Sequence, residues 1–230
     1  ASKCFNPMSG DINDRGGNRR HIPRAVEASL KRLGTDRLDI LFMHRFDDDA
    51  AIEETLRALE DLVRAGKVLY LGASNYAAWQ IAMSLGIAER RGWTRFDVIQ
   101  PMYNLVKRQA EVEILPLARA ENLGVVTYSP VGGGLLSGKF RPGTRPNDGR
   151  LVENASYSRR YGDEWMLETA GAFGEFADAR GVHPVTLAVA WAAAHPDVTC
   201  PIIGARSLEQ LQPSLDALDF ELPADLRDEI

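Results

Sequence analysis

The run Leu38-Asp39-Ile40-Leu41-Phe42-Met43-His44 decides the fold together with three later runs of the same kind. These are Val68-Leu69-Tyr70-Leu71-Gly72-Ala73-Ser74-Asn75, Phe96-Asp97-Val98-Ile99-Gln100 and Val125-Val126-Thr127-Tyr128-Ser129. Each run is mainly apolar and ends on a polar or reactive side chain, and the runs recur roughly every 29 residues. Because helix-patterned segments fill the gaps, the pattern predicts successive β-α units that build a parallel sheet.

The ends of these strands carry the clearest functional signal in the chain. In a parallel barrel, residues at the carboxyl ends of the strands line the active site. The polar side chains at those positions are His44, Ser74, Asn75, Gln100 and Tyr128. We therefore expect them to contribute to one site.

Composition restricts the possible functions. The chain has 230 residues, of which 45% are hydrophobic and 26% charged, as in an ordinary globular protein. The net charge of −5 and the lack of a dense Lys/Arg run argue against a nucleic-acid partner. No stretch approaches the roughly 18 apolar residues of a membrane span, and the start does not resemble a signal peptide. The two cysteines, Cys4 and Cys200, form no disulfide framework, so we expect a reducing cytoplasm, and a metal held by His195 and Cys200 has no supporting spacing.

Periodicity and end signals predict the remaining elements. A short strand is expected at residues 1–5, and a helix at residues 25–33 that Gly34 ends. Asp47-Asp48-Asp49 precedes a helix at residues 52–63, and we interpret this triplet as an N-cap with favourable dipole charge rather than as a metal site. Further helices are predicted at 77–91, 111–121, 163–179, 184–194 and 208–218, and a last strand at 200–203.

Between residues 131 and 158 the alternation of strands and helices breaks. This segment is rich in Gly, Pro and Arg, and it contains Gly132-Gly133-Gly134 and Gly138-Lys139. A connection of this length within a compact domain is usually functional. Since no linker is apparent, we predict a single domain over residues 1–230.

The number of strands is the main difficulty for a closed fold. Six strands can be counted, whereas a closed (β/α)8 barrel needs eight. An open doubly wound sheet could stop at six, but the glycine fingerprint expected after its first strand is missing. The chain also starts inside a predicted strand and stops at Ile230 inside a predicted helix, so we expect it to be part of a longer protein.

Five strings follow one another along almost the whole chain. They are Ala1-Ser2-Lys3, Ser29-Leu30-Lys31-Arg32-Leu33-Gly34-Thr35-Asp36-Arg37-Leu38-Asp39 followed by His44, Gly72-Ala73-Ser74-Asn75-Tyr76, Gln100-Pro101-Met102-Tyr103-Asn104 and Tyr128-Ser129-Pro130. In this order and spacing they resemble the signatures of the aldo-keto reductases. The resemblance implies an α/β fold of the (β/α)8 TIM-barrel class, here lacking the first two β-α units.

The resemblance implies hydride transfer between a nicotinamide cofactor and a carbonyl carbon. The family's catalytic tetrad is Asp, Tyr, Lys and His, of which Lys3 and His44 match the last two, while the Asp and Tyr would lie upstream of Ala1. The ammonium of Lys3 would stabilise the phenolate of the tyrosine that donates the proton, and His44 would hydrogen-bond the substrate carbonyl. From the residues alone, Lys3 could also be a plain terminal lysine or a Schiff-base lysine, and His44 a structural histidine.

The resemblance also assigns contacts to the nicotinamide and the phosphates. Ser74, Asn75 and Gln100 match residues that hydrogen-bond the carboxamide, and Tyr128 matches the aromatic residue that stacks on the ring. Sequence alone would instead favour a core role for Tyr128. The segment beside the pyrophosphate is matched by Ser129, Pro130, Val131 and Gly132, with Lys139 and Arg150 as candidate phosphate contacts.

The adenine end is expected at Ile203-Gly204-Ala205-Arg206-Ser207, which opens the last predicted helix. Backbone N–H groups such as that of Gly204 suit an anion there, and Arg206 could bind a 2′-phosphate, which favours NADPH/NADP⁺ over NADH. Gln210 matches an adenine-side position. Pro213 and Ser214 stand where the family often has Glu and Asn, so Ser214 is the candidate contact at the second of these positions.

Three functions stay open. The first is an NADPH-dependent reductase of small aldehydes or ketones, with neither nucleic acid nor membrane as a partner. The second is a nicotinamide-binding, redox-sensing subunit similar to potassium-channel β subunits, and the third is an inactive fragment with two unpaired sheet edges. Retention of His44 favours the enzyme, because loss of that histidine marks the channel-associated relatives.

Overall fold

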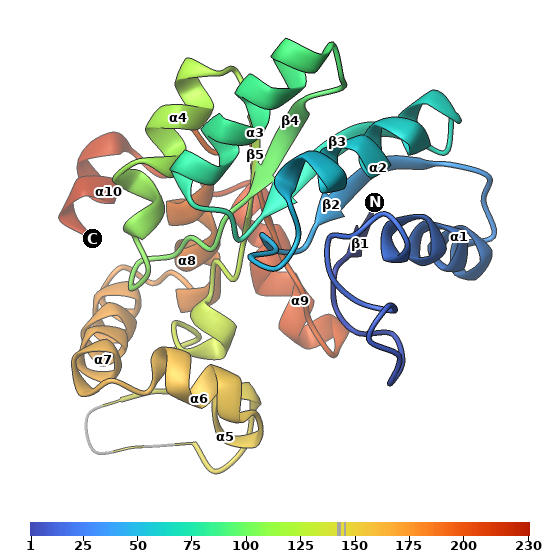
Figure 1. The fold of residues 1–230 in the computed structure, drawn as a ribbon. Helices are drawn as coiled ribbons and strands as arrows, with labels where there is room; N and C mark the ends of the chain where they lie inside the picture. Colours follow the sequence, from blue (N-terminus) through green and yellow to red (C-terminus); the bar gives the residue numbers. More distant parts are fainter. Residues whose placement is uncertain (142–143, 145) are drawn as a thin grey trace. The chain divides into compact units, whose positions relative to one another are not determined.

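The computed structural model describes residues 1–141, 144 and 146–230, and the strands found in these residues are parallel and follow the order β1-β2-β3-β4-β5-β6 (Figure 1). They are β1 (Ser2–Cys4), β2 (Leu38–Met43), β3 (Val68–Ser74), β4 (Phe96–Gln100), β5 (Gly124–Tyr128) and β6 (Cys200–Ile202). The prediction that the four apolar runs form neighbouring parallel strands is confirmed. The fold is therefore α/β, whereas closure into eight units stays a prediction.

The elements gather into two compact units whose sequences interleave. The first unit contains residues 1–101 and 113–125, and the second contains residues 102–112 and 126–230. Strand β5 contributes Gly124 and Val125 to the first unit and its last three residues to the second.

In the first unit, each strand is followed by a helix that packs against the sheet or a neighbouring helix. The helices are α1 (His21–Leu33), α2 (Ile52–Arg64), α3 (Ala78–Arg91) and α4 (Ile114–Ala120). Helix α1 contacts β1 and α2, while α2 contacts β3 and α3. The buried residues of α1 recur with helical spacing, among them Ile22, Val26 and Leu30, and Gly34 ends the helix in the left-handed conformation (φ 66°) that its sequence predicts.

The interpretation of Asp47-Asp48-Asp49 as an N-cap is wrong. Helix α2 begins at Ile52, and its N-cap residue is Ala51, which makes no side-chain cap. Asp47 Oδ2 instead accepts a hydrogen bond from Gly17 N at 2.6 Å, and Thr55 Oγ1 donates to Gly17 O at 2.6 Å. The carboxylate is therefore used to hold the loop between β1 and α1, while Glu53 and Glu54 place acidic charge in the first turn of α2.

The helix predicted at 111–121 is split in the structure. A 3-10 turn, η1 (Gln109–Glu111), precedes α4, and the chain passes from the second unit to the first between Val112 and Glu113. Pro116 occupies the third position of α4, where its missing N–H removes no intrahelical bond.

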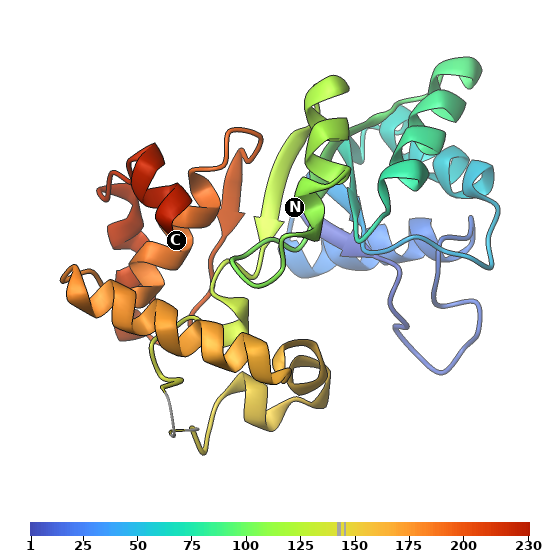
Figure 2. The same cartoon turned by 90° about the vertical axis from the view of Figure 1, so that its left-hand side faces the viewer.

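The second unit contains most of the long connection and the last helices. Besides η1 and β6, it contains η2 (Gly132–Gly134), α5 (Arg150–Glu153), α6 (Ala155–Tyr161), α7 (Glu164–Ala179), α8 (Pro184–Ala193), α9 (Leu208–Leu215), η3 (Asp216–Leu218) and α10 (Ala224–Glu229). Helices α5 and α6 were not predicted, and they lie beside the amino-terminal end of α7 (Figure 2). Asn154 caps α6 by accepting hydrogen bonds from Ser156 N and Tyr157 N. Buried Leu135, Leu136, Tyr161, Met166, Phe173 and Leu187 belong to the core of this unit.

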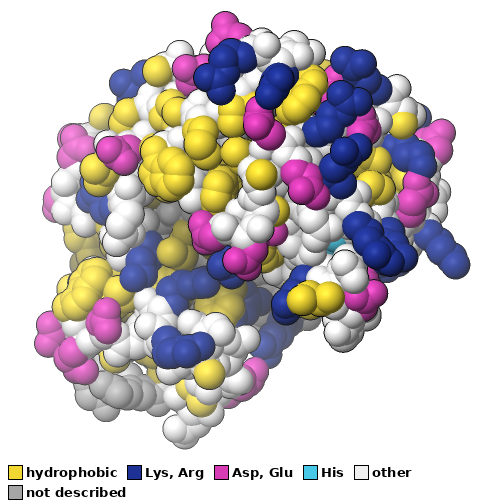
Figure 3. All heavy atoms as spheres, viewed as in Figure 1, with side chains coloured by type: hydrophobic (Ala, Val, Ile, Leu, Met, Phe, Trp, Pro, Cys, Tyr) yellow, Lys and Arg dark blue, Asp and Glu magenta, His cyan; other side chains and the backbone are white. Residues whose placement is uncertain are grey.

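The surface mixes both signs of charge. Figure 3 shows basic and acidic side chains interspersed on one face of the molecule. Ion pairs such as Arg57–Asp61 and Arg91–Glu53 account for part of this mixture. Among the described residues, no helix combines the length and the apolar character that crossing a bilayer requires.

Candidate active site

The first unit brings five of the predicted site residues to the carboxyl-end edge of its sheet. Lys3 lies in β1, His44 directly follows β2, and Ser74 and Gln100 end β3 and β4 as partners in the sheet register. Asn75 follows Ser74. These five residues are the strand-end cluster, and their convergence is a consequence of the parallel register.

Hydrogen bonds connect four residues of the strand-end cluster, namely His44, Ser74, Asn75 and Gln100. Ser74 is 1% exposed, and its hydroxyl donates to Gln100 O at 2.9 Å. The amide Nδ2 of Asn75 donates to His44 O at 2.8 Å and to Ser74 Oγ at 3.1 Å. Asn75 has a left-handed backbone (φ 55°), which asparagine tolerates better than most residues. The amide of Asn75 thereby links the ends of β2 and β3.

His44 is set up as a neutral hydrogen-bond donor. Asn6 Nδ2 lies 3.1 Å from His44 Nδ1, so that nitrogen accepts and the ring proton is assigned to Nε2. Desolvation lowers the pKa of His44, and the nearby cations Lys3 and Arg45 lower it further. The ring is therefore neutral at pH 7, with its Nε2–H available to an acceptor.

Lys3 lies on the same face of the sheet as an aromatic ring. Its register partner is Phe42, whose own partner in the next strand is Gly72. The ammonium of Lys3 is 5.8 Å from the centroid of the Phe42 ring. A side chain at Gly72 would overlap the Phe42 ring, so the glycine makes room for the ring beside Lys3.

The second unit contains the end of β5 and the turn that follows it. Tyr128 is half-buried, and burial raises the pKa of its phenol, which stays neutral. Ser129 has a left-handed backbone (φ 60°), and Ser129 O accepts from Gly132 N at 2.9 Å. Three successive glycines, Gly132 to Gly134, also have positive φ, so the chain turns sharply just after Pro130 and Val131.

Two residues that the sequence did not assign, Asn104 and Tyr161, hold this strand end. Asn104 is fully buried, and its Nδ2 donates to Ser129 O at 2.9 Å and to the Tyr161 hydroxyl at 3.1 Å. That hydroxyl in turn donates to Met102 Sδ at 3.3 Å. Asn104 stands in one of the quoted strings, so its motif was a signal that could have identified it. No local pattern marks Tyr161, because it lies in α6, 57 residues away from Asn104.

The remaining predicted contacts lie on the surface of the second unit, with one exception. Lys139 is exposed, and Arg150 begins α5 with its guanidinium 5.2 Å from the centroid of the Tyr157 ring. Gly204 and Arg206 are exposed after β6, and Arg206 pairs with Glu153 at 3.3 Å. Ser214 is instead buried in α9.

Gln210 takes part in hydrogen bonds at the start of α9. Ser207 caps the helix by accepting a hydrogen bond from Gln210 N, and Gln210 Oε1 accepts from Arg206 N at 3.1 Å. This reciprocal arrangement resembles a capping box, and it holds the backbone of Arg206 against the start of the helix. Within the described ranges, no group of three or more His, Cys, Asp or Glu is arranged to hold a metal ion.

Comparisons with known proteins show what the chain is similar to. A family model described as the aldo/keto reductase family matches residues 1–230. An uncharacterized oxidoreductase of Bacillus subtilis, YrpG, is 37% identical over 98% of this chain and 68% of its own length. A probable voltage-gated potassium channel subunit beta of Arabidopsis thaliana is 38% identical over 90% of this chain and 64% of its own length. The versiconal hemiacetal acetate reductase of Aspergillus parasiticus is 35% identical over 93% and 62%, so the chain spans about two thirds of these relatives.

Proposed function

Because the chain belongs to the aldo/keto reductase family, we propose that it serves in the NADPH-dependent reduction of small aldehydes or ketones in the cytoplasm. The observation that carries the proposal is the strand-end cluster. It gathers a cation, a neutral imidazole donor and three amide or hydroxyl groups at one edge of the sheet in the first unit. We assign Lys3 and His44 to the reaction, and Ser74, Asn75 and Gln100 to the binding of the cofactor.

The side chains of this cluster suit the polar steps of carbonyl reduction. The Nε2–H of His44 would donate a hydrogen bond to the substrate oxygen and orient it. The ammonium of Lys3 would favour the phenolate form of a neighbouring tyrosine and so make that tyrosine a usable acid at neutral pH. That tyrosine and its aspartate partner match no motif of this chain, so we expect them from a segment outside it.

Each unit, taken by itself, offers groups that suit part of a nicotinamide dinucleotide. In the first unit, Ser74, Asn75 and Gln100 supply the donors and acceptors that a carboxamide needs. In the second unit, Tyr128 supplies an aromatic face, and Arg206 an exposed guanidinium that matches a 2′-phosphate. When bound, the cofactor would supply the hydride.

The test is a titration of the folded protein with NADPH and NADH, followed by quenching of tryptophan fluorescence. We expect saturable binding that favours NADPH. Arg206→Ala should raise the Kd for NADPH about tenfold to a hundredfold, because charge-assisted hydrogen bonds contribute about 1.5–3 kcal/mol, and should change the Kd for NADH less than about twofold.

The matched control is Glu153→Gln, which removes the ion pair of Arg206 but keeps the guanidinium. We expect this variant to bind NADPH at least as tightly as the wild type. An equal loss of both cofactors in Arg206→Ala would contradict the 2′-phosphate assignment. A folded protein that binds neither cofactor would contradict the proposed function.

A second candidate function is a nicotinamide-binding, redox-sensing subunit. The similarity to potassium channel β subunits of two plants favours it. The neutral donor state of His44 favours the enzyme, because a sensing subunit has no need to polarise a carbonyl. A protein that binds NADPH but never oxidises it in the presence of aldehydes, with its complete tetrad in place, would support the sensing role.

A further inference from the structure

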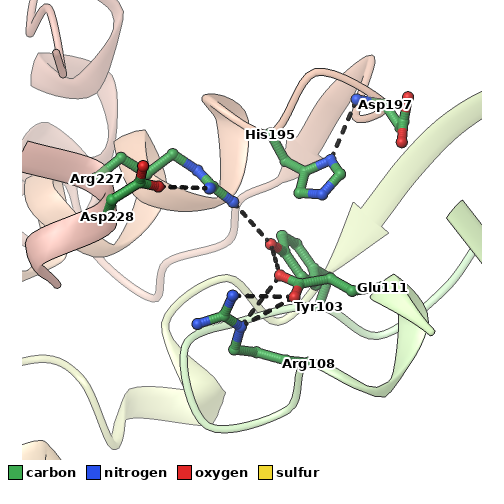
Figure 4. Close-up of polar contacts among 7 residues, drawn as sticks. All are labelled: Tyr103, Arg108, Glu111, His195, Asp197, Arg227 and Asp228. Carbon is green, nitrogen blue, oxygen red and sulfur yellow. Dashed lines mark hydrogen bonds and ion pairs between the residues drawn. The ribbon is translucent and has the colours of Figure 1, made fainter. Parts of the chain in front are cut away.

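Tyr103, in the second unit, is the centre of a polar and aromatic cluster that the proposed reaction does not use (Figure 4). Tyr103 is fully buried, and its hydroxyl donates to Glu111 Oε1 at 2.5 Å. The same oxygen accepts a hydrogen bond from the guanidinium of Arg227 at 3.1 Å. Arg108 also bonds the Glu111 carboxylate, at 3.0–3.2 Å. The hydroxyl is thus held by one group from η1 and one from α10.

The ring of Tyr103 is fixed as firmly as its hydroxyl. It stacks on Trp191 of α8, with a centroid distance of 5.2 Å and an interplanar angle of 25°. The guanidinium groups of Arg108 and Arg227 lie 5.2 and 5.0 Å from the centroid of the Trp191 ring. His195 meets Tyr103 edge-on at 5.6 Å. Stacking and hydrogen bonding together hold Tyr103 in this position.

The protonation states of Glu111 and Tyr103 match the hydrogen bond between them. Although burial pushes the pKa of Glu111 upward, hydrogen bonds from Arg108 and Tyr103 hold it below its usual value. Burial and the Glu111 carboxylate raise the pKa of Tyr103. Glu111 is therefore a carboxylate acceptor and Tyr103 a protonated donor at neutral pH.

The backbone of Tyr103 connects the cluster to the end of β5. Tyr103 N donates to Tyr128 O at 3.3 Å, and Met102 and Tyr128 form a parallel bridge. The next residue, Asn104, holds Ser129 O. A displacement of Tyr103 would therefore move the residue assigned to stack on the nicotinamide.

Helix α10 contacts Tyr103 through Arg227. The helix has six residues, and its polar anchors are Arg227, which bonds Tyr103, and Glu229, which accepts from Arg180 at 2.6 Å. Phe220, Leu222 and Ile230, on either side of α10, pack against the core of the second unit. Of the two polar anchors, only Arg227 touches a residue that is hydrogen-bonded to the end of β5.

We propose that Arg227 and Tyr103 form a latch through which α10 positions Tyr128 for the nicotinamide. Both are positioning residues, and the inference rests on the proposed cofactor function. Through this latch, the docking of α10 affects the affinity for the nicotinamide half of the cofactor. Arg227 of α10 lies 124 residues from Tyr103 in the chain.

The experiment compares Arg227→Ala with Arg180→Ala, since each removes one anchor of α10 and only the first touches Tyr103. We expect Arg227→Ala to raise the Kd for NADPH roughly fivefold to tenfold and to speed amide exchange of Tyr103 and Gly132 roughly tenfold. Arg180→Ala should change both less than about twofold. Binding of 2′,5′-ADP, which lacks the nicotinamide, should stay within about twofold of wild type in both variants.

A second variant, Tyr103→Phe, keeps the stacked ring and tests the latch even if Arg227→Ala fails to fold. It should reproduce the effects of Arg227→Ala, and the double variant should be no worse than either single one. Equal effects of Arg227→Ala and Arg180→Ala, or faster exchange with an unchanged Kd for NADPH, would overturn the latch. A folded wild type that does not bind NADPH would overturn the proposed function instead, and the exchange rates would then decide whether Arg227 holds the strand end.

Discussion

Asn75 combines a backbone requirement with a side-chain requirement at a single position. Its φ of 55° lies in the left-handed region, which costs an ordinary L-residue roughly 1–2 kcal/mol. Its amide holds the carbonyl of His44 and the hydroxyl of Ser74. Asparagine is one of the few residues that meet both needs, because its short polar side chain tolerates this conformation.

Substitutions at Asn75 should separate these two requirements. Asn75→Gly keeps the backbone conformation and Asn75→Ala strains it, so the glycine variant should be more stable by up to about 1 kcal/mol in urea unfolding. Both lose the amide and should lose NADPH affinity to the same extent. If the glycine variant bound NADPH as the wild type does, the amide would have no part in binding.

Some residues of the site could be predicted from the sequence and others could not. His44, Ser74 and Gln100 could be placed because each ends a strand, and parallel strands end at one edge. Tyr161 could not, since its partner Asn104 is 57 residues away and no local pattern connects them. The role of Asp47 was predicted wrongly for the same reason, because its carboxylate accepts a hydrogen bond from the backbone of Gly17, 30 residues earlier in the chain.

Strand β3 depends on a glycine that has no role in a turn. Gly72 lies opposite Phe42 in the register, and the Phe42 ring occupies the space that a side chain at position 72 would need. That ring in turn lies beside the ammonium of Lys3. The packing of two strands is thereby connected to the position of a proposed catalytic group.

The contrast between two glycines tests this packing. Gly72→Ala should lower the free energy of unfolding by about 1–3 kcal/mol, because the added methyl displaces the Phe42 ring. Gly86→Ala, in α3, should raise it by about 0.5–1 kcal/mol, because a side chain there meets no atom within 4 Å and alanine favours the helix. Chemical denaturation measures both, and a harmless Gly72→Ala would mean that the ring has room to move.

Elements were predictable where periodicity and an end signal coincide. Helix α1 ends at Leu33 as Gly34 predicts, and β4 spans Phe96–Gln100, as its apolar run does. The short helices α5 and α6 were not predicted, because segments of four and seven residues show too little periodicity to be recognised. Helix α4 was predicted to be longer than it is, because the sequence does not show where the chain passes from the second unit to the first.

Each of the two units has its own cysteine. Cys4 of β1 is 4% exposed, and burial raises the pKa of its thiol to about 12. Cys200 of β6, in the second unit, is exposed. The thiolate is the reactive form, so Cys4 is protected from reagents both by its burial and by its raised pKa, whereas Cys200 is accessible.

A thiol-reactive dye should therefore distinguish the folded from the unfolded protein. At pH 8 we expect Cys200 to react within minutes and Cys4 to react only in denaturant, because Cys4 is both inaccessible and protonated. Cys200→Ser should abolish the fast reaction. Rapid labelling of that variant without denaturant would show that the first unit opens readily at β1.

The interleaved sequences of the two units have a consequence for biosynthesis. After Pro101 the ribosome adds residues 102–112, which belong to the second unit, before it makes residues 113–125, which complete the first. At about 5–20 residues per second, the nascent first unit waits roughly 1–5 s for the 24 residues after Pro101. During that interval β4 has no partner on its far side, since Val98 and Ile99 pair with Gly124 and Val125. An exposed apolar strand edge is what chaperones protect on growing chains, so the nascent first unit needs such help until β5 has emerged.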